Sequence, residues 1–144
     1  MKKQICILGS TGSIGTQALD VISQHEDLYE VYCLTANTRI ELLAEQAHHF
    51  HPAAIVVADE TKYQDLCRLM DDMPEVKVYA GAQALCDIVE AEPIDMVLTA
   101  MVGFSGLEPT IHAIKAKKKI CLANKETLVV AGELICKLAV ENHV

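Results

Sequence analysis

Short apolar runs alternate with longer amphipathic segments along the whole chain, and this alternation restricts the possible folds more than any other feature. Short apolar runs between turn residues predict buried strands, and the amphipathic segments after them predict helices that cover a sheet. The expected strands are Ile5–Leu8, Val31–Thr35, Ala54–Val57, Val76–Tyr79, Met96–Thr99 and Lys119–Ala123. The expected helices, one after each strand, are Ile14–Gln24, Ile40–Phe50, Glu60–Met70, Ala82–Val89, Leu107–Ala116 and Glu126–Glu141.

Six strand–helix units in series predict a doubly wound, Rossmann-like α/β fold, with a mostly parallel sheet and helices on both faces. The composition agrees, because 51% of the residues are hydrophobic and only 4% are aromatic. An aliphatic core of this kind is typical of a parallel sheet that is buried on both faces. The 144 residues suit one domain.

The chain is acidic, with 20 Asp and Glu against 12 Lys and Arg and a net charge of −8. This balance argues against a non-specific nucleic-acid binder, which needs a basic surface. An anionic ligand would have to be held locally, by backbone amides or by a few basic side chains. We expect no membrane partner, because no apolar run approaches the roughly 20 residues that span a bilayer.

Six cysteines are scattered along the chain without a Cys-x-x-Cys pair, and each lies in an apolar stretch: Cys6, Cys33, Cys67, Cys86, Cys121 and Cys136. Free cysteine in such surroundings behaves as a small hydrophobic residue. We therefore expect reduced, structural thiols. The apolar stretch near Met1 is too short for a signal peptide, and a cytoplasmic location follows from both observations.

The glycine-rich segment Gly9–Gly15 (Gly-Ser-Thr-Gly-Ser-Ile-Gly) follows the first expected strand and opens the first expected helix. In a dinucleotide-binding turn, glycines allow a tight bend, a close approach of backbone to pyrophosphate, and close packing of helix on strand. The helix N-terminus offers free N–H groups to the phosphates. We expect the hydroxyls of Ser10, Thr11 and Ser13 to add donors, and a side chain at Gly12 to block the phosphate and strain the backbone.

The segment Thr35–Arg39 (Thr-Ala-Asn-Thr-Arg) follows the second expected strand. NAD-binding domains usually place an acidic residue here, which accepts a hydrogen bond from the ribose 2′-hydroxyl. No carboxylate is present in this segment, and Arg39 can pair with a 2′-phosphate. A charge-assisted hydrogen bond is worth about 1.5–3 kcal/mol, which corresponds to a roughly ten- to hundredfold preference for NADPH over NADH.

Two further segments follow the last two expected strands, where doubly wound folds place their sites. Small residues fill Ala100–Gly106, which suggests a close approach of backbone to a ring or to another segment. An amide, an ammonium and a carboxylate follow one another in Asn124-Lys125-Glu126. These side chains could orient a nicotinamide and anchor an anionic substrate through Lys125. Alternatively, Asn124 or Thr127 caps the last helix.

Three groups of residues together resemble the 1-deoxy-D-xylulose 5-phosphate reductoisomerase family: Gly9–Gly15, Gly103–Leu107 with Pro109-Thr110, and Leu122–Val129. The resemblance runs along the whole chain and corresponds to the N-terminal NADPH-binding domain of the family. It implies that residues 1–144 are a fragment, with the catalytic and C-terminal domains of the parent enzyme elsewhere.

The resemblance implies an enzyme that isomerises and reduces 1-deoxy-D-xylulose 5-phosphate, a ketose phosphate, to 2-C-methyl-D-erythritol 4-phosphate in the non-mevalonate route to isoprenoids. Its cofactors would be NADPH and Mg²⁺ or Mn²⁺, and the parent would be a homodimer. By position, the expected cofactor contacts are Gly9, Thr11, Gly12, Ser13, Ile14, Asn37, Thr38, Arg39, Asn124 and Glu126. Lys125 would reach the substrate. The metal ligands of the family would lie outside this chain, so we expect the fragment alone to be inactive.

The sequence departs from the family in two places. The triplet Asn37-Thr38-Arg39 stands where the family often has Gly-Lys-Asn, which moves the basic residue by one position. Lys117 stands where a glycine is usual, which should affect a turn and not the chemistry.

Other interpretations remain open from the residues alone. A semialdehyde dehydrogenase shares the glycine spacing but needs a catalytic cysteine in its next domain. An extended short-chain reductase needs Tyr-x-x-x-Lys, which is absent from the sequence. A dinucleotide sensor would bind the cofactor without chemistry. The histidines His48, His49 and His51 suggest a metal, but no nearby carboxylate completes a site, so solvated helix-end histidines are the preferred interpretation.

Overall fold

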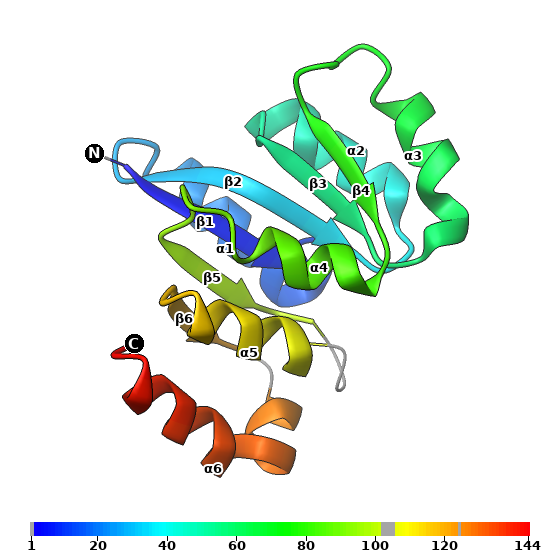
Figure 1. Ribbon diagram of the computed structural model, residues 1–144. Helices are drawn as coiled ribbons and strands as arrows, with labels where there is room; N and C mark the ends of the chain where they lie inside the picture. The colour runs from blue at the N-terminus through cyan, green and yellow to red at the C-terminus, as the bar shows by residue number, and fades with distance from the viewer. Residues whose placement is uncertain (1, 102–105, 124) are drawn as a thin grey trace.

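A computed structural model describes residues 2–101, 106–123 and 125–144, without the side chains of 125–131. Its centre is a six-stranded sheet in which every paired strand is parallel, in the order β4-β3-β2-β1-β5-β6 (Figure 1). The strands are β1 (Lys3–Leu8), β2 (Tyr29–Ala36), β3 (Ala54–Val57), β4 (Lys77–Ala80), β5 (Met96–Thr99) and β6 (Lys119–Leu122). The predicted doubly wound α/β fold is confirmed, with a sheet that is parallel throughout.

The helices follow the strands in the predicted alternation. They are α1 (Ser13–Ser23), α2 (Ile40–Phe50), α3 (Tyr63–Leu69), α4 (Ala82–Ile88), α5 (Leu107–Lys115) and α6 (Lys125–Glu141). One predicted helix, Glu60–Met70, is divided, because a 3₁₀ turn, η1 (Glu60–Lys62), precedes α3. The carboxylate of Asp59 accepts hydrogen bonds from the backbone N–H and the hydroxyl of Thr61, at 3.0 and 2.6 Å. This local cap competes with an α-helical start.

Two apolar cores lie on opposite faces of the sheet. One packs α1, α2 and α3 against alternate residues of the central strands, including Ile7, Leu34 and Ile55, all fully buried. The other packs α4 and α5 against the intervening residues, including Cys6 and Val56, which are also fully buried. Because side chains alternate across a strand, each central strand contributes to both cores. Its residues must therefore be apolar without interruption.

The strand order reverses beside β1. From β1 the chain moves outward through β2, β3 and β4 on one side, and then returns to place β5 and β6 on the other. Strand β5 therefore pairs directly with β1 on the side opposite β2, with Leu8 opposite Thr99. In open α/β sheets, ligands bind at such a switch point, outside the carboxyl ends of the strands. The edge formed by the ends of β1, β2 and β5 is therefore the place to look for a site.

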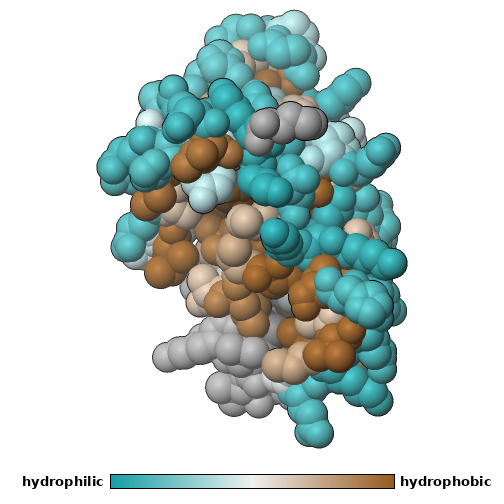
Figure 2. Space-filling model, turned by 90° about the vertical axis from the view of Figure 1, so that its left-hand side faces the viewer, coloured by the Kyte–Doolittle hydropathy of each residue, from teal (hydrophilic) through white to brown (hydrophobic). Residues whose placement is uncertain are grey.

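The opposite edge, where the strands begin, faces the viewer in Figure 2. Hydrophobic side chains reach the surface over a broad area of this face, among hydrophilic ones. Leu28, which precedes β2 at this edge, is 51% exposed. Among the helices of the described residues, none combines the length and the apolar character needed to cross a bilayer.

The cysteines are free thiols, as predicted, but they differ in burial. Cys6, Cys33 and Cys86 are buried, whereas Cys121 and Cys136 are exposed and Cys67 is partly exposed. The sheet explains Cys121: β6 is an edge strand, paired only with β5 in the described chain, so its residues lack a neighbour on the other side.

Candidate functional site

The glycine-rich turn lies at the carboxyl end of β1, between the ends of β2 and β5. Gly9 has φ of +89°, a conformation that side chains disfavour. Its N–H donates to Oγ1 of Thr35 in β2 at 2.8 Å. A Cβ built on Gly9 would lie 2.9 Å from the carbonyl oxygen of Ala100, which follows β5. The turn is thus fixed between its two neighbouring strands, and only glycine fits at its first position.

The other two glycines of the turn have different surroundings. A Cβ on Gly15, in α1, would lie 2.2 Å from the carbonyl oxygen of Gly9 and 2.6 Å from Cα of Ser10. Gly15 therefore permits close packing of the helix on the turn, as predicted. Gly12 has φ of −81°, and the nearest atom to a Cβ there is the Gly9 oxygen, at 3.8 Å. The predicted backbone strain at Gly12 is wrong, because this φ is accessible to every residue.

Helix α1 begins with backbone donors that the described chain does not use. Its N-cap is Gly12, which has no side chain to cap the first turn, and that turn contains no acidic residue. The first N–H of the helix with a backbone acceptor is that of Thr16, which donates to the Gly12 oxygen at 2.9 Å. Among the described residues, none accepts from the N–H groups of Ser13, Ile14 and Gly15. Such a helix start, with its partial positive charge, is suited to an anion.

The hydroxyl groups of the turn do not all face the same way. The side chain of Ser10 is fully buried and donates to the carbonyl oxygen of Thr35 and to Oε1 of Gln46, at 3.2 and 2.7 Å. Nε2 of Gln46 in turn donates to the Ser10 carbonyl oxygen at 2.9 Å. The expectation that Ser10 adds a donor for a ligand is therefore wrong. Thr11 is 7% exposed, whereas Ser13 is exposed at the helix start.

Arg39 connects the second predicted contact segment to the first. Its guanidinium Nη1 donates to the carbonyl oxygen of Thr11 at 3.1 Å, although the two residues are far apart in the sequence. Asn37, Thr38 and Arg39 are all exposed, in the connection between β2 and α2. The structure thus places a cation beside the glycine-rich turn.

An acidic residue that sequence reasoning missed follows the neighbouring strand, β3. The backbone N–H of Asp59 donates to the carbonyl oxygen of Asn37 at 3.0 Å, so the two connections lie side by side. The carboxylate of Asp59 accepts hydrogen bonds from Thr61, and these bonds lower its pKa from the ordinary value of 3.8. The sequence signal was present, because Asp59 comes two residues after the predicted strand Ala54–Val57, which pairs with β2 in the sheet.

The segments after β5 and β6 are described only in part. Asn124 and residues 102–105 lie outside the described residues, and so does the first part of the motif that contains Gly103. Lys125 and Glu126 are the first two residues of α6, and their side chains are not described. Strands β5 and β6, which precede these segments in the sequence, are adjacent and parallel, so their carboxyl ends lie at the same edge of the sheet.

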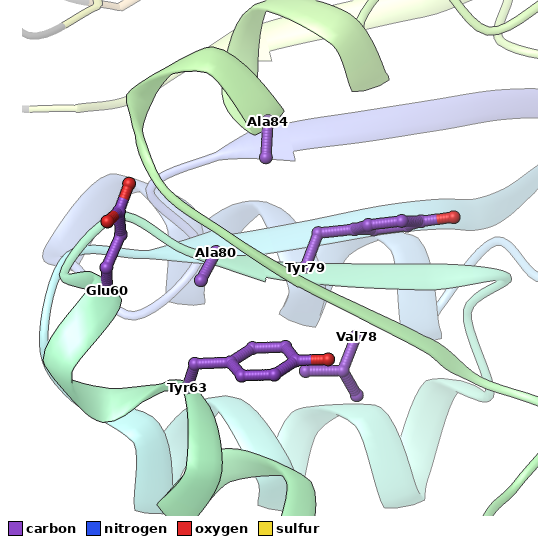
Figure 3. A pocket seen from close by; sticks show the side chains of 6 residues that line it. All are labelled: Glu60, Tyr63, Val78, Tyr79, Ala80 and Ala84. Atoms are coloured by element: carbon purple, nitrogen blue, oxygen red, sulfur yellow. The ribbon is translucent and has the colours of Figure 1, made fainter.

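A cavity of about 400 Å³ lies beside β4, the edge strand that is separated from β1 by two other strands. Figure 3 shows the ring of Tyr63, from α3, beside Val78 of β4, with Tyr79 on the other side of this strand. Glu60, Ala80 and Ala84 complete the lining. Strands β2 and β3 separate β4 from the glycine-rich turn, and none of the predicted contact residues lines this cavity.

One carboxylate does lie beside a histidine of α2, although it does not complete a metal site. Nε2 of His48 lies 2.9 Å from Oδ1 of Asp72, which follows α3. The hydrogen bond raises the pKa of His48 and lowers that of Asp72. This pair joins the end of α2 to the segment after α3, and it contains one histidine and one carboxylate, which is too few for a metal site.

The chain is similar to proteins of known function along almost its whole length. The family model described as 1-deoxy-D-xylulose 5-phosphate reductoisomerase matches residues 5–132. A protein of that name from Bacteroides thetaiotaomicron is 66% identical over 142 residues, which are 99% of this chain and 36% of the relative. Another, from Porphyromonas gingivalis, is 58% identical over 144 residues, 100% of this chain and 37% of the relative.

Solved structures agree with these similarities. A reductoisomerase from Zymomonas mobilis in complex with NADPH superposes with a TM-score of 0.93 at 36% identity, over 99% of this chain and 37% of the other. A crystal structure of DOX-P reductoisomerase in complex with magnesium gives 0.93 at 37% identity, over 99% and 36%. A homoserine dehydrogenase from Thiobacillus denitrificans, at 17% identity and a TM-score of 0.61, shares the fold alone. The chain spans little more than a third of the length of the curated relatives.

Proposed function

The chain belongs to the 1-deoxy-D-xylulose 5-phosphate reductoisomerase family, and from this premise we propose that residues 1–144 are the NADPH-binding domain of a longer reductoisomerase. The observation that carries the proposal is the start of α1. Three backbone N–H groups there have no acceptor in the described chain. The guanidinium of Arg39 lies beside the same turn and donates to the carbonyl oxygen of Thr11 at 3.1 Å. Family membership decides against the semialdehyde dehydrogenase and short-chain reductase interpretations.

The residues of the turn fit the phosphates of a dinucleotide. Backbone donors of Ser13, Ile14 and Gly15 point out of the first turn of a helix, where the dipole favours negative charge. A Cβ on Gly12 would meet no atom closer than 3.8 Å, so its surface leaves room for a phosphate to approach the backbone. Gly9 and Gly15 permit the bend itself, and Thr11 is buried within it.

Arg39 is proposed to select NADPH by pairing with the 2′-phosphate, next to Asn37 and Thr38. When bound, the dinucleotide would supply the hydride for a reduction, and this chain would bind and orient it. Oδ1 of the Asp59 carboxylate accepts both hydrogen bonds from Thr61. Asp59 follows β3, whereas NAD-specific domains place the acid that accepts from a ribose 2′-hydroxyl after the second strand, and that position holds no carboxylate here.

The remaining roles follow the family. We propose that Asn124 and Glu126 contact the cofactor and that Lys125 contacts the substrate, 1-deoxy-D-xylulose 5-phosphate, at the carboxyl ends of β5 and β6. The product would be 2-C-methyl-D-erythritol 4-phosphate, made in the cytoplasm by a homodimer for isoprenoid synthesis. We further propose, from the family alone, that Mg²⁺ or Mn²⁺ is held by residues outside these 144.

Cofactor choice tests the proposal directly. NADPH and NADH are titrated into the chain, and binding is followed by calorimetry. We expect NADPH to bind roughly ten- to a hundredfold more tightly, and Arg39→Ala to remove this preference while NADH affinity changes little. Lys62→Ala, which removes a partly exposed cation after β3, is the matched control and should leave the preference unchanged. Equal affinities of the wild-type chain for the two cofactors would contradict the proposal.

A second experiment tests whether these 144 residues can catalyse the reaction without the rest of the enzyme. The chain is mixed with NADPH, Mg²⁺ or Mn²⁺ and 1-deoxy-D-xylulose 5-phosphate, and the nicotinamide absorbance is followed. We expect cofactor binding without turnover. Oxidation of NADPH in proportion to the amount of chain, retained on repurification, would show that these residues hold a complete catalytic site.

A further inference from the structure

A second group of chemically reactive side chains lies between α4 and α5, apart from the glycine-rich turn. Cys86 of α4 and Glu108 and His112 of α5 each place one potential ligand atom within 4.8 Å of the other two. Glu108 and His112 are four residues apart, so they lie on the same face of α5. The cluster contains a sulfur, a nitrogen and an oxygen donor, a combination that an ordinary solvated surface does not require.

The ring of His112 is already held in place by a carboxylate. Its Nδ1 lies 2.5 Å from Oε1 of Glu90, which follows α4. A neutral imidazole that donates from Nδ1 keeps a lone pair on Nε2 for a metal. In metal sites the ligating histidine almost always donates its other N–H to a carboxylate or carbonyl, which fixes the tautomer and raises the basicity of the ligand. Glu90 and His112 have this relationship.

Cys86 is the buried member of the cluster. Its residue is 2% exposed, and its thiol has no hydrogen-bond partner among the described residues. Burial raises the pKa of the thiol to about 11, and the negative charges of Glu108, Asp87 and Glu90 contribute. A bound cation would reverse this electrostatic effect, because it neutralises the surrounding carboxylates and stabilises the thiolate directly.

We propose that Cys86, Glu108 and His112 form a binding site for a divalent zinc-like cation, with Glu90 as the carboxylate that orients His112. Sulfur, imidazole and carboxylate ligands together suit Zn²⁺ and Co²⁺ better than Mg²⁺ or Mn²⁺, which prefer oxygen. Tetrahedral zinc requires ligand atoms about 3.5 Å apart, so side-chain rotations that bring the three donors about 1 Å closer would complete the site. Water would occupy the fourth position, since Glu108 is exposed.

The site would connect two helices that cover the same face of the sheet. Helix α5 begins after β5 at the ligand-binding edge, and Glu108 lies in its first turn. Cys86 lies near the end of α4 and beside the core residues Leu85 and Val89. A cation held between them would fasten α4 to α5 and restrain the start of α5. This role is independent of the dinucleotide and of the proposed reaction.

Cobalt is the probe that reports the ligands. Co²⁺ is titrated into the purified, reduced chain at neutral pH, and the thiolate-to-cobalt charge-transfer band is recorded in the near ultraviolet, together with the visible bands of a tetrahedral site. We expect both to develop to one equivalent and to disappear when Zn²⁺ is added. The affinity should fall as the pH is lowered, because cation binding must displace the thiol proton.

Variants assign the band to the cluster. Cys86→Ala should abolish the charge-transfer band, whereas the matched variants Cys121→Ala and Cys136→Ala, which remove exposed thiols, should retain it. Glu90→Gln should weaken Co²⁺ and Zn²⁺ binding about 10- to 100-fold. Glu92→Gln, an exposed acid two residues away, should not weaken binding. Circular dichroism of each variant without metal checks the fold, and the exposed position of Glu90 keeps the test usable if Cys86→Ala unfolds.

Three results would overturn the proposal. The first is a wild-type chain that gives no charge-transfer band with Co²⁺. The second is a band that survives in Cys86→Ala and is lost with Cys121 or Cys136, which would place the metal on surface thiols. The third is a Glu90→Gln variant that binds as tightly as the wild type. In that case the Glu90–His112 contact is an ion pair between helices and orients no ligand.

Discussion

Replacing Gly15 by alanine places a methyl group inside the backbone of the glycine-rich turn. The new Cβ would lie 2.2 Å from the Gly9 oxygen and 2.6 and 2.8 Å from Cα and the carbonyl carbon of Ser10. All three are main-chain atoms, so no side chain can rotate away. Relief requires α1 and the turn to separate by roughly 1 Å, since carbon atoms pack at about 3.5–4.0 Å.

The turn cannot move freely, because its contacts on the other side are also close. The N–H of Gly9 donates a hydrogen bond to Oγ1 of Thr35 at 2.8 Å. The hydroxyl of Ser10 is hydrogen-bonded to Thr35 and Gln46. Forcing atoms into a packed region costs about 1–3 kcal/mol and occasionally more. For a domain of this size, 1 kcal/mol corresponds to about 3–4 °C, so Gly15→Ala should lower the melting temperature by about 3–12 °C.

Gly12→Ala is the matched control within the same turn. Its Cβ would meet nothing closer than 3.8 Å, and its φ of −81° suits alanine. Alanine loses less chain entropy on folding but is a poorer N-cap than glycine, and these effects offset one another. We expect the stability to stay within about 0.5 kcal/mol of wild type, whereas NADPH affinity should fall, because the methyl group occupies the proposed phosphate approach.

Thermal and urea unfolding followed by circular dichroism, with NADPH titration on the folded variants, separates the two effects. The reasoning would be refuted if Gly15→Ala were as stable as the wild-type chain. It would also be refuted if Gly12→Ala lost stability and Gly15→Ala did not. Undiminished NADPH binding by Gly12→Ala would mean that the cofactor does not approach the turn at this position.

The remaining predictions concern buried polar bonds, pH and backbone conformation. Ser10→Ala should destabilise the chain by about 1–3 kcal/mol in urea unfolding, because it leaves the buried Oε1 of Gln46 without its donor; an unchanged midpoint would contradict this. The raised pKa of His48 stabilises the folded chain below pH 6.5, and this stability is lost as the pH rises through the folded-state pKa. The lowered pKa of Asp72 stabilises the folded chain above pH 3.8, and this stability is lost on acidification. Asp72→Asn should therefore destabilise the chain most between these values, and a stability difference from wild type that grows above neutral pH would exclude the pair as its cause. Lys117, at φ of +63°, should accept glycine with a gain of about 0.5–1 kcal/mol in unfolding free energy, and a loss of stability would show that its side chain has a role.

Local patterns in the sequence were enough to predict most of the fold. The strands Ala54–Val57 and Met96–Thr99 and the helix Ile40–Phe50 have the predicted bounds. Apolar periodicity determines these elements, and it depends on neighbours a few residues away. The divided helix after β3 departs from prediction because the Asp59 carboxylate bonds to Thr61, a competition that periodicity does not record.

The glycine spacing after a strand also predicted the turn at the start of α1, where three N–H groups have no acceptor among the described residues. Anion binding at this turn stays a prediction. The spacing did not determine the separate role of each glycine or hydroxyl. Gly9 is restricted by Ala100, and Ser10 is turned inward by Gln46. These partners reach the turn only through the order of the strands.

Only the tertiary structure brought together the groups that act across elements. Arg39 lies beside Thr11 because β2 adjoins β1 in the sheet. His48 meets Asp72, and Cys86 meets His112, through the packing of neighbouring helices. Short-range periodicity fixes which face of each element is buried. The contacts between side chains distant in sequence depend on how those faces pack, and no local spacing contains that information.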